Sequence, residues 1–217
     1  MSSIDLVQKI IGFIEDSGLV NAGVGSHLNI NKQAEMDASL LSFKGNTSSI
    51  LQASVTGVDC INNPIKICKE MINLQELQFK SLIQNEMHAP NFIAWNDYQR
   101  DKFKASMGEY QFVFDEKIMY TQKKLKKYKQ LIESREKESN TKESNIKDNV
   151  AIDQKLVQDT IGVILIAIDS NNEIECVIAT SSGGPWLKEA GRIGSKNTGL
   201  IEHNLMKKLA ARPLIWD

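Results

Sequence analysis

The sequence has 217 residues, 41% of them hydrophobic, and 26 basic residues nearly balance 27 acidic ones. Such a chain can bury a core, and its net charge of -1 gives no chain-wide field that would favour nucleic acid or an anionic membrane as partner. The three cysteines, Cys60, Cys68 and Cys176, are odd in number and widely spaced. We therefore expect buried thiols in a reducing compartment, the cytoplasm or the nucleus, and no zinc site. The N-terminus lacks the pattern of a secretion signal, and no run approaches the ~18 apolar residues that span a membrane.

The first 60 residues predict a helix, a loop and a hairpin. Apolar residues recur at helical spacing over residues 4–15, which predicts an amphipathic helix. Residues 15–29 are rich in glycine and turn formers but lack the GxxxxGK[ST] pattern of a phosphate-binding loop, so we expect a tightly bent loop. Residues 35–41 and 49–55 have the length and apolar content of two strands, and the polar turn between them predicts a hairpin.

The middle of the chain predicts helices followed by a linker. Asn63, at a cap position before Pro64, predicts a helix over residues 64–84, whose inner face is formed by Ile65, Cys68, Met71 and Ile72. Residues 92–107 predict a further helix. Residues 121–158 are rich in charge and poor in apolar side chains, which predicts a solvated, flexible linker. Its basic cluster at residues 123–129 fits either a nuclear import signal or the solvated end of a helix.

Two apolar segments, residues 161–168 and 174–180, follow the linker and are separated by a polar turn. Because the first strand is apolar on both faces, we expect it at the centre of a sheet covered on both sides, in a layered α/β architecture. A hairpin of two strands of similar length would bring residues 181–184 back beside Thr160.

Thr160 stands where the charged segment meets this apolar run. A threonine hydroxyl becomes a useful nucleophile if the peptide bond before it is cut and its own α-amino group serves as the base. Such an amine titrates at about 7.7 to 8.0, close to working pH. From these residues alone, the alternative is that Asp159 and Thr160 merely start a strand.

Six motifs occur in the order seen in the plant-type asparaginase family, which includes isoaspartyl peptidases, glycosylasparaginases and threonine aspartases (taspases). The resemblance covers roughly residues 10–195. It implies an α/β (α+β) fold, the four-layer αββα architecture of N-terminal nucleophile hydrolases, here incomplete. The motifs are the Asn-Ala-Gly loop at 21–29, Glu-Met-Asp-Ala-Ser at 35–39, Asn-Pro-Ile at 63–65, Asp-Thr-Ile-Gly at 159–162, Ser-Gly-Gly at 182–184 and Gly-Arg-Ile-Gly at 191–194.

The resemblance implies self-cleavage between Asp159 and Thr160. It divides the chain into an α-subunit core, residues 1–120, the flexible charged linker, residues 121–158, and the start of the β subunit, residues 159–217. Thr160 would be nucleophile and amine base, Ser182 would orient it, and Asn21 would face the site. The residues implied for substrate binding are Arg192, which would grip a substrate carboxylate, with Ser195, Thr198 and Gly199.

The resemblance also implies which cofactors, ions and partner chains accompany the site. It suggests no catalytic metal or organic cofactor, a structural sodium ion at the loop from Glu15 to Asn21, and self-association of αβ units. The family's opening strand is absent, the region after Ser195 is abbreviated, and nothing corresponds to the family beyond Arg212. We therefore expect a sequence truncated at both ends.

Two positions distinguish the branches of the family. Asp159 resembles taspases and glycosylasparaginases, whereas asparaginases usually have glycine there. Ser195 stands where enzymes for small amino-acid amides carry an aspartate that holds the α-ammonium group, so an internal peptide bond is favoured as substrate. The main hypothesis is a threonine-type endopeptidase that cleaves proteins or peptides after aspartate. The alternatives are an L-asparaginase or β-aspartyl peptidase, and a non-catalytic fragment or remnant of such an enzyme.

Overall fold

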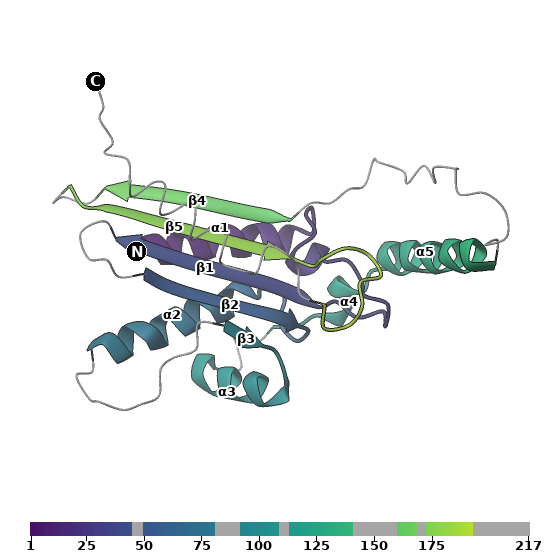
Figure 1. Cartoon of the computed structure of the whole chain (residues 1–217), viewed down its shortest axis with the longest axis horizontal. Helices are drawn as coiled ribbons and strands as arrows, with labels where there is room; N and C mark the ends of the chain where they lie inside the picture. Colours follow the sequence, from purple (N-terminus) through teal and green to yellow (C-terminus); the bar gives the residue numbers. More distant parts are fainter. Residues whose placement is uncertain (45–49, 81–91, 109–112, 141–159, 169–171, 193–217) are drawn as a thin grey trace, which may run out of the picture.

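The structure is a computed structural model that describes residues 1–44, 50–80, 92–108, 113–140, 160–168 and 172–192 (Figure 1). It is a mixed α+β fold of one five-stranded sheet and a layer of helices. The elements in chain order are α1 (Ser3–Ser17), a 3₁₀ turn (Gly23–Gly25), β1 (Met36–Lys44), β2 (Ile50–Val58), α2 (Ile65–Lys80), β3 (Phe92–Ala94), α3 (Asp97–Met107), α4 (Glu116–Met119), α5 (Gln122–Asn140), β4 (Ile161–Ile168) and β5 (Ile174–Ser182).

The sheet has the strand order β3-β2-β1-β5-β4. Its four long strands run antiparallel to their neighbours, and β3 joins β2 in parallel. The two predicted hairpins, β1–β2 and β4–β5, are both confirmed. β5 lies between β1 and β4, so the end of the chain's second hairpin is bonded to the start of the first.

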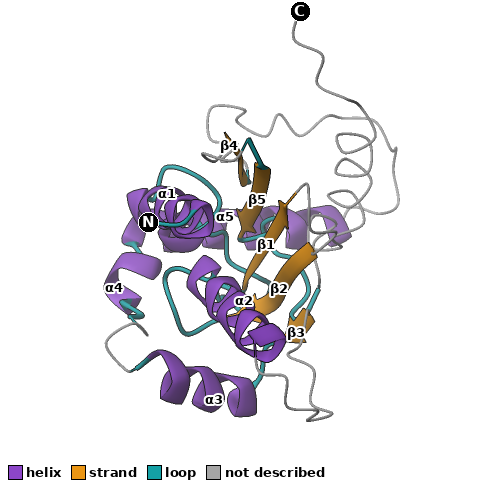
Figure 2. Ribbon diagram, turned by 90° about the vertical axis from the view of Figure 1, so that its left-hand side faces the viewer, coloured by secondary structure: helices purple, strands orange, loops and turns teal. Residues whose placement is uncertain are grey.

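The helices α1 and α2 cover one face of this sheet (Figure 2). α1 packs against β4 and β5, and α2 packs against β1 and β2. A capping box between Ser2 and Asp5 starts α1, and Gly18, with a left-handed φ of 65°, ends it. The inner face predicted for α2 is buried as expected. The main core therefore lies between the two helices and the sheet.

The opposite face of the sheet is only partly covered by described residues. Leu41, Cys176 and Ile178 form a small buried cluster there. Ile164, Ile166 and Ile168 alternate with half-buried residues along β4 and are 57%, 55% and 63% exposed. The expectation that this strand lies at a sheet's centre is wrong for the described sheet, in which β4 is the edge strand. An apolar run shows that both faces favour burial, but it does not show which neighbours supply the cover.

The predicted helix over residues 92–107 is correct only in its second part. Phe92–Ala94 forms a short strand and the helix begins at Asp97, because the Asn96 side chain accepts a hydrogen bond from Gln99 N (2.9 Å) as an N-cap. The Asn63 cap is also corrected. The Asn63 amide instead donates to the Gly12 carbonyl (3.2 Å) and to Asp16 Oδ1 (2.8 Å), so it ties α2 to the end of α1.

The linker predicted for residues 121–158 contains a helix, α5, in its first half. This helix was not predicted, because the segment is highly charged and has few apolar residues. Leu125 and Tyr128 pack against the main core, and the Tyr128 hydroxyl donates to the Ile30 carbonyl (2.7 Å). Lysine and glutamate also favour a helix intrinsically. Residues 141–158 lie outside the described part of the chain.

Two of the four layers implied by the family resemblance, one of helices and one sheet, are thus seen in the described residues. Cys60, Cys68 and Cys176 are free thiols; Cys68 and Cys176 are buried as expected, whereas Cys60 is only partly buried. Within the described segments, no helix is both long and apolar enough to cross a membrane.

Candidate active site

The hydroxyls of Thr160 and Ser182 lie 2.9 Å apart, within hydrogen-bonding distance. The hairpin produces this contact: Ile161 pairs with Ser181, which places the residue before β4 beside the last residue of β5. Ser182 Oγ also accepts a hydrogen bond from the Gly184 amide (3.1 Å). With one acceptor position already used, Ser182 can donate its proton to Thr160 Oγ1 or accept the proton of Thr160. The predicted juxtaposition of these two side chains is confirmed.

Asn21 is joined to the same corner of the fold. The Asn21 side-chain amide donates to the Gly184 carbonyl (2.7 Å), and the Asn21 backbone carbonyl accepts from the Gly183 backbone amide (2.8 Å). Gly183 must lack a side chain, because a Cβ would lie 2.5 Å from Ser26 Cβ and 2.6 Å from Asn21 Oδ1. The loop at 21–26 and the end of β5 are therefore held in contact by backbone and amide groups.

Glu15 lies beneath this loop and is completely buried. Burial raises its pKa from 4.5 to about 8, and the nearby polar groups of Ser181 and Asn63 only partly oppose the shift. Among the described residues, neither carboxyl oxygen receives a hydrogen bond of normal geometry. A Cβ on Gly23 would collide with Glu15, so the loop closes directly over this acid.

The resemblance implies a sodium ion at the loop from Glu15 to Asn21. Without an ion, burial favours the protonated form of Glu15 near pH 7. A bound hard cation would instead favour the carboxylate, whose oxygens are the donors that such a cation binds, so the residues present fit an ion with Glu15 as a ligand. The described residues contain no group of three or more His, Cys, Asp or Glu side chains that could bind a metal. The ion stays a prediction.

Contacts with the N-terminal loops position the segment after β5. Trp186 stacks on His27, with ring centroids 4.6 Å apart and planes inclined by 18°. Burial lowers the pKa of His27 to about 4, so the ring is neutral near pH 7 and no charge is buried against the indole. Lys188, 3% exposed, donates to the Glu35 carbonyl (2.9 Å) and lies 4.0 Å from the Glu35 carboxylate.

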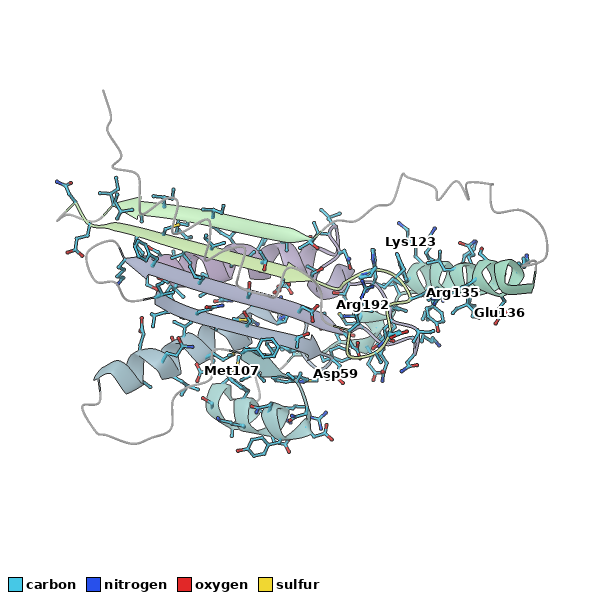
Figure 3. The ribbon with its side chains drawn as sticks, in the orientation of Figure 1. Asp59, Met107, Lys123, Arg135, Glu136 and Arg192 are labelled. Atoms are coloured by element: carbon cyan, nitrogen blue, oxygen red, sulfur yellow. The ribbon has the colours of Figure 1, made fainter. Side chains whose placement is uncertain are left out.

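Arg192, the predicted substrate-binding arginine, is exposed and lies beside α5 rather than in the Thr160–Ser182 contact (Figure 3). It lines a hollow of about 520 Å³ together with Arg135, Trp186 and Lys188. Asp159, Ser195, Thr198 and Gly199 lie outside the described residues. Of the predicted set, the structure brings Thr160 and Ser182 into contact and joins Asn21 to the residues that follow Ser182. The hollow lined by Arg192 includes neither Thr160 nor Ser182, and the binding of a substrate carboxylate by Arg192 stays a prediction.

Two contributors to this region were not predicted from the sequence. Lys188 gave no signal because a single lysine near a glycine turn is usually solvated. Asp37 was quoted only as part of a motif, yet it is buried and accepts hydrogen bonds from Thr56 Oγ1 (2.6 Å) and Gly57 N (3.1 Å). Its position opposite Ser182 in the β1–β5 register could have been found only once the strand order was known.

The hydroxyl pair at the head of a hairpin in a mixed α+β fold fits the class of N-terminal nucleophile hydrolases. Comparison with known families is more specific. The sequence model of the family described as asparaginase matches residues 1–198. The chain therefore belongs to the asparaginase family.

Similar proteins carry related names. The chain is 26% identical over 193 residues to a plant-type L-asparaginase from Pyrococcus horikoshii, covering 89% of this chain and 54% of that protein. It is 27% identical over 193 residues to a human isoaspartyl peptidase/L-asparaginase, with 89% and 51% covered. A bovine isoaspartyl peptidase/L-asparaginase is 40% identical over 68 residues, or 31% and 21% of the two chains. The chain thus spans about half the length of the first two relatives.

Proposed function

We propose that this chain carries the nucleophile of a threonine-type hydrolase that acts on the side-chain amide of asparagine or on β-aspartyl bonds. The observation that carries the proposal is the 2.9 Å contact between Thr160 Oγ1 and Ser182 Oγ. The names of the similar proteins, L-asparaginase and isoaspartyl peptidase, support the choice of substrate. Both substrate types present a β-carboxamide carbon to the nucleophile and differ only in the amine that leaves.

The chemistry requires cleavage before Thr160. In the intact chain the nitrogen of Thr160 belongs to an amide, which is not a base; after cleavage it is an amine that can accept the hydroxyl proton. Thr160 Oγ1 then adds to the substrate carbonyl, the amine passes the proton to the departing nitrogen, and ammonia or an amino acid leaves. Water hydrolyses the resulting ester and releases aspartate. Ser182 would hold Thr160 Oγ1 in line throughout these steps.

The test is release of ammonia from L-asparagine, and of the free amino acid from a β-aspartyl dipeptide, by the purified chain. We expect release by the wild type and none by Thr160→Ala. Ser134→Ala removes an exposed hydroxyl that is bonded to the Gln130 carbonyl within α5 and serves as the control that should keep activity. Equal release by the wild type and Thr160→Ala would exclude Thr160 as the nucleophile.

A second candidate is an endopeptidase that cleaves after aspartate. It is favoured by the identities of Asp159 and Ser195, which provide an aspartate at the self-cleavage site and remove the carboxylate that would hold a free α-ammonium group. A peptide spanning residues 154–164 of this sequence is the natural probe. Cleavage of that peptide after its aspartate, without ammonia release from asparagine, would favour the endopeptidase over the first candidate.

A further inference from the structure

A second, basic cavity is lined in part by the loop that carries Asn21. It has a volume of about 420 Å³, and its walls come from α4, α5, the loop after α1 and Trp186. None of its lining residues is acidic; they are Gly18, Val24, Gly25, Ile118, Thr121, Lys123, Lys124, Lys126, Lys127, Gln130 and Trp186. Figure 3 shows Lys123 at the end of α5 nearest the sheet. Four ammonium groups thus share one hollow with an indole and two aliphatic side chains.

Helical spacing directs three of these lysines to one side. Lys123, Lys126 and Lys127 are separated by three and four residues, so they occupy one face of α5, while Tyr128 packs towards the core. The arrangement costs stability. Like charges four residues apart repel, and cations in the first turns oppose the helix dipole, yet the first turn of α5 holds no acidic residue to offset them.

Lys124 adds a half-buried charge at the same place. Its ammonium donates to the Val24 carbonyl (2.6 Å) and to the Met119 carbonyl (2.8 Å), so it fixes α5 to the loop. Burial lowers the pKa of Lys124 to about 8, which is the expected response of an ammonium that is partly removed from water. An ammonium has three N–H donors, so two carbonyl acceptors leave one donor for a ligand.

We propose that this cavity binds a small polyanion, a phosphorylated molecule with an apolar portion. Phosphate groups would lie among Lys123, Lys126 and Lys127, and the apolar portion would contact Trp186. The volume falls within the range of about 300 to 1,000 Å³ of small-molecule sites. A long nucleic acid is disfavoured, since the chain's net charge is only -1 and the basic side chains are confined to one hollow.

Binding there would reach the candidate active site through direct contacts. Val24 and Gly25 line the cavity and follow Asn21 in the same loop. Trp186, also in the lining, stacks on His27, whose backbone amide donates to Asn21 Oδ1 (2.9 Å). A ligand should therefore slow amide exchange in residues 20–27, an effect that does not depend on the proposed hydrolase activity.

The experiment is calorimetric titration of the full chain with inorganic pyrophosphate and, separately, with ATP at low salt. We expect both to bind, ATP more tightly because its apolar ring system adds contacts with Trp186. Lys123→Gln combined with Lys127→Gln should weaken binding by at least about tenfold, since charge-assisted hydrogen bonds are lost. Lys129→Gln is the matched control, because Lys129 is exposed on α5 and does not line the cavity.

Thermal unfolding of each variant shows whether it folds. Because removal of repelling lysines should not destabilise α5, we expect the double variant to unfold at or above the temperature of the wild type. The proposal fails if neither probe binds, if Lys129→Gln weakens binding as much as the double variant, or if an acidic peptide binds the cavity more tightly than ATP. Exchange protection of residues 20–27 by pyrophosphate, lost in the double variant, supports it.

Discussion

At the scale of single residues, the contact between Thr160 and Ser182 can be tested by itself. Ser182→Ala removes the hydroxyl that lies 2.9 Å from Thr160 Oγ1. We expect self-cleavage and turnover to fall by roughly 10- to 100-fold, the loss typical of one hydrogen bond to a group that develops charge. Ser182→Thr, which keeps the hydroxyl, should recover most of the rate.

Rates measured by quenched gel time courses check this role. Ser134→Ala is a suitable control because its hydroxyl is exposed and bonded only within α5. Should Ser182→Ala and Ser134→Ala react equally fast, Ser182 does not orient the nucleophile.

Glu15 predicts an unusual dependence of stability on pH. Its pKa is raised from 4.5 to about 8 in the folded chain, so the folded state holds its proton more tightly than the unfolded state. The sign follows from linkage: this stabilisation is complete below pH 4.5, falls as pH rises, and is lost above about pH 8. Glu15→Gln cannot ionise and should therefore be more stable than the wild type at pH 8.5, by about 1 to 3 kcal/mol.

Urea unfolding at pH 5 and at pH 8.5 measures the effect. At pH 5 the two proteins should have similar free energies of unfolding, because both carry a neutral side chain. Addition of sodium at pH 8.5 should stabilise the wild type and not Glu15→Gln if the ion binds at Glu15. A wild type that is equally stable at both pH values contradicts the burial of this acid.

At the scale of elements, a few contacts with the rest of the fold stabilise α5. Tyr128→Phe removes the hydrogen bond to the Ile30 carbonyl (2.7 Å) and should cost about 1 kcal/mol of local stability. Hydrogen exchange across residues 122–137 should become faster. Tyr98→Phe is the matched control, since Tyr98 on α3 is 71% exposed. Unchanged exchange in Tyr128→Phe would show that the packing of Leu125 suffices.

The elements also show how far the sequence could be read. Period-two and period-3.6 patterns located both hairpins, α1 and α2, and the hairpin geometry put Ser182 beside Thr160 before any strand order was known. They could not order the sheet, because the edge position of β4 depends on which segments lie next to it. They also missed α5, a lysine-rich helix in which Leu125 and Tyr128 provide the packing against the core. They could not predict the burial of Lys188 or of Asp37.

At the scale of the whole molecule, one face of the sheet presents exposed isoleucines among the described residues. Contiguous apolar surface of this kind marks a contact site, and the family resemblance places a second sheet on it. We expect the chain to bind the dye ANS strongly. Replacement of Ile164 and Ile166 by threonine should reduce dye binding and change stability by less than about 1 kcal/mol, because these side chains are more than half exposed.

Leu165 provides the opposite case on the same strand. It packs against the main core on the helix-covered face, so Leu165→Thr should lower the free energy of unfolding by about 1 to 3 kcal/mol and leave dye binding unreduced. Dye fluorescence and urea unfolding of the two variants separate the faces. Equal losses of stability would mean that the outward isoleucines are covered as well as Leu165.

The central claim is that Thr160 becomes a new N-terminus and acts as the nucleophile. Mass spectrometry of the purified chain during prolonged incubation tests it most directly. We expect two fragments, residues 1–159 and 160–217, the second beginning at Thr160, with Thr160→Ala remaining intact under the same conditions. A wild-type chain that stays whole, or that breaks at another bond, would contradict the account.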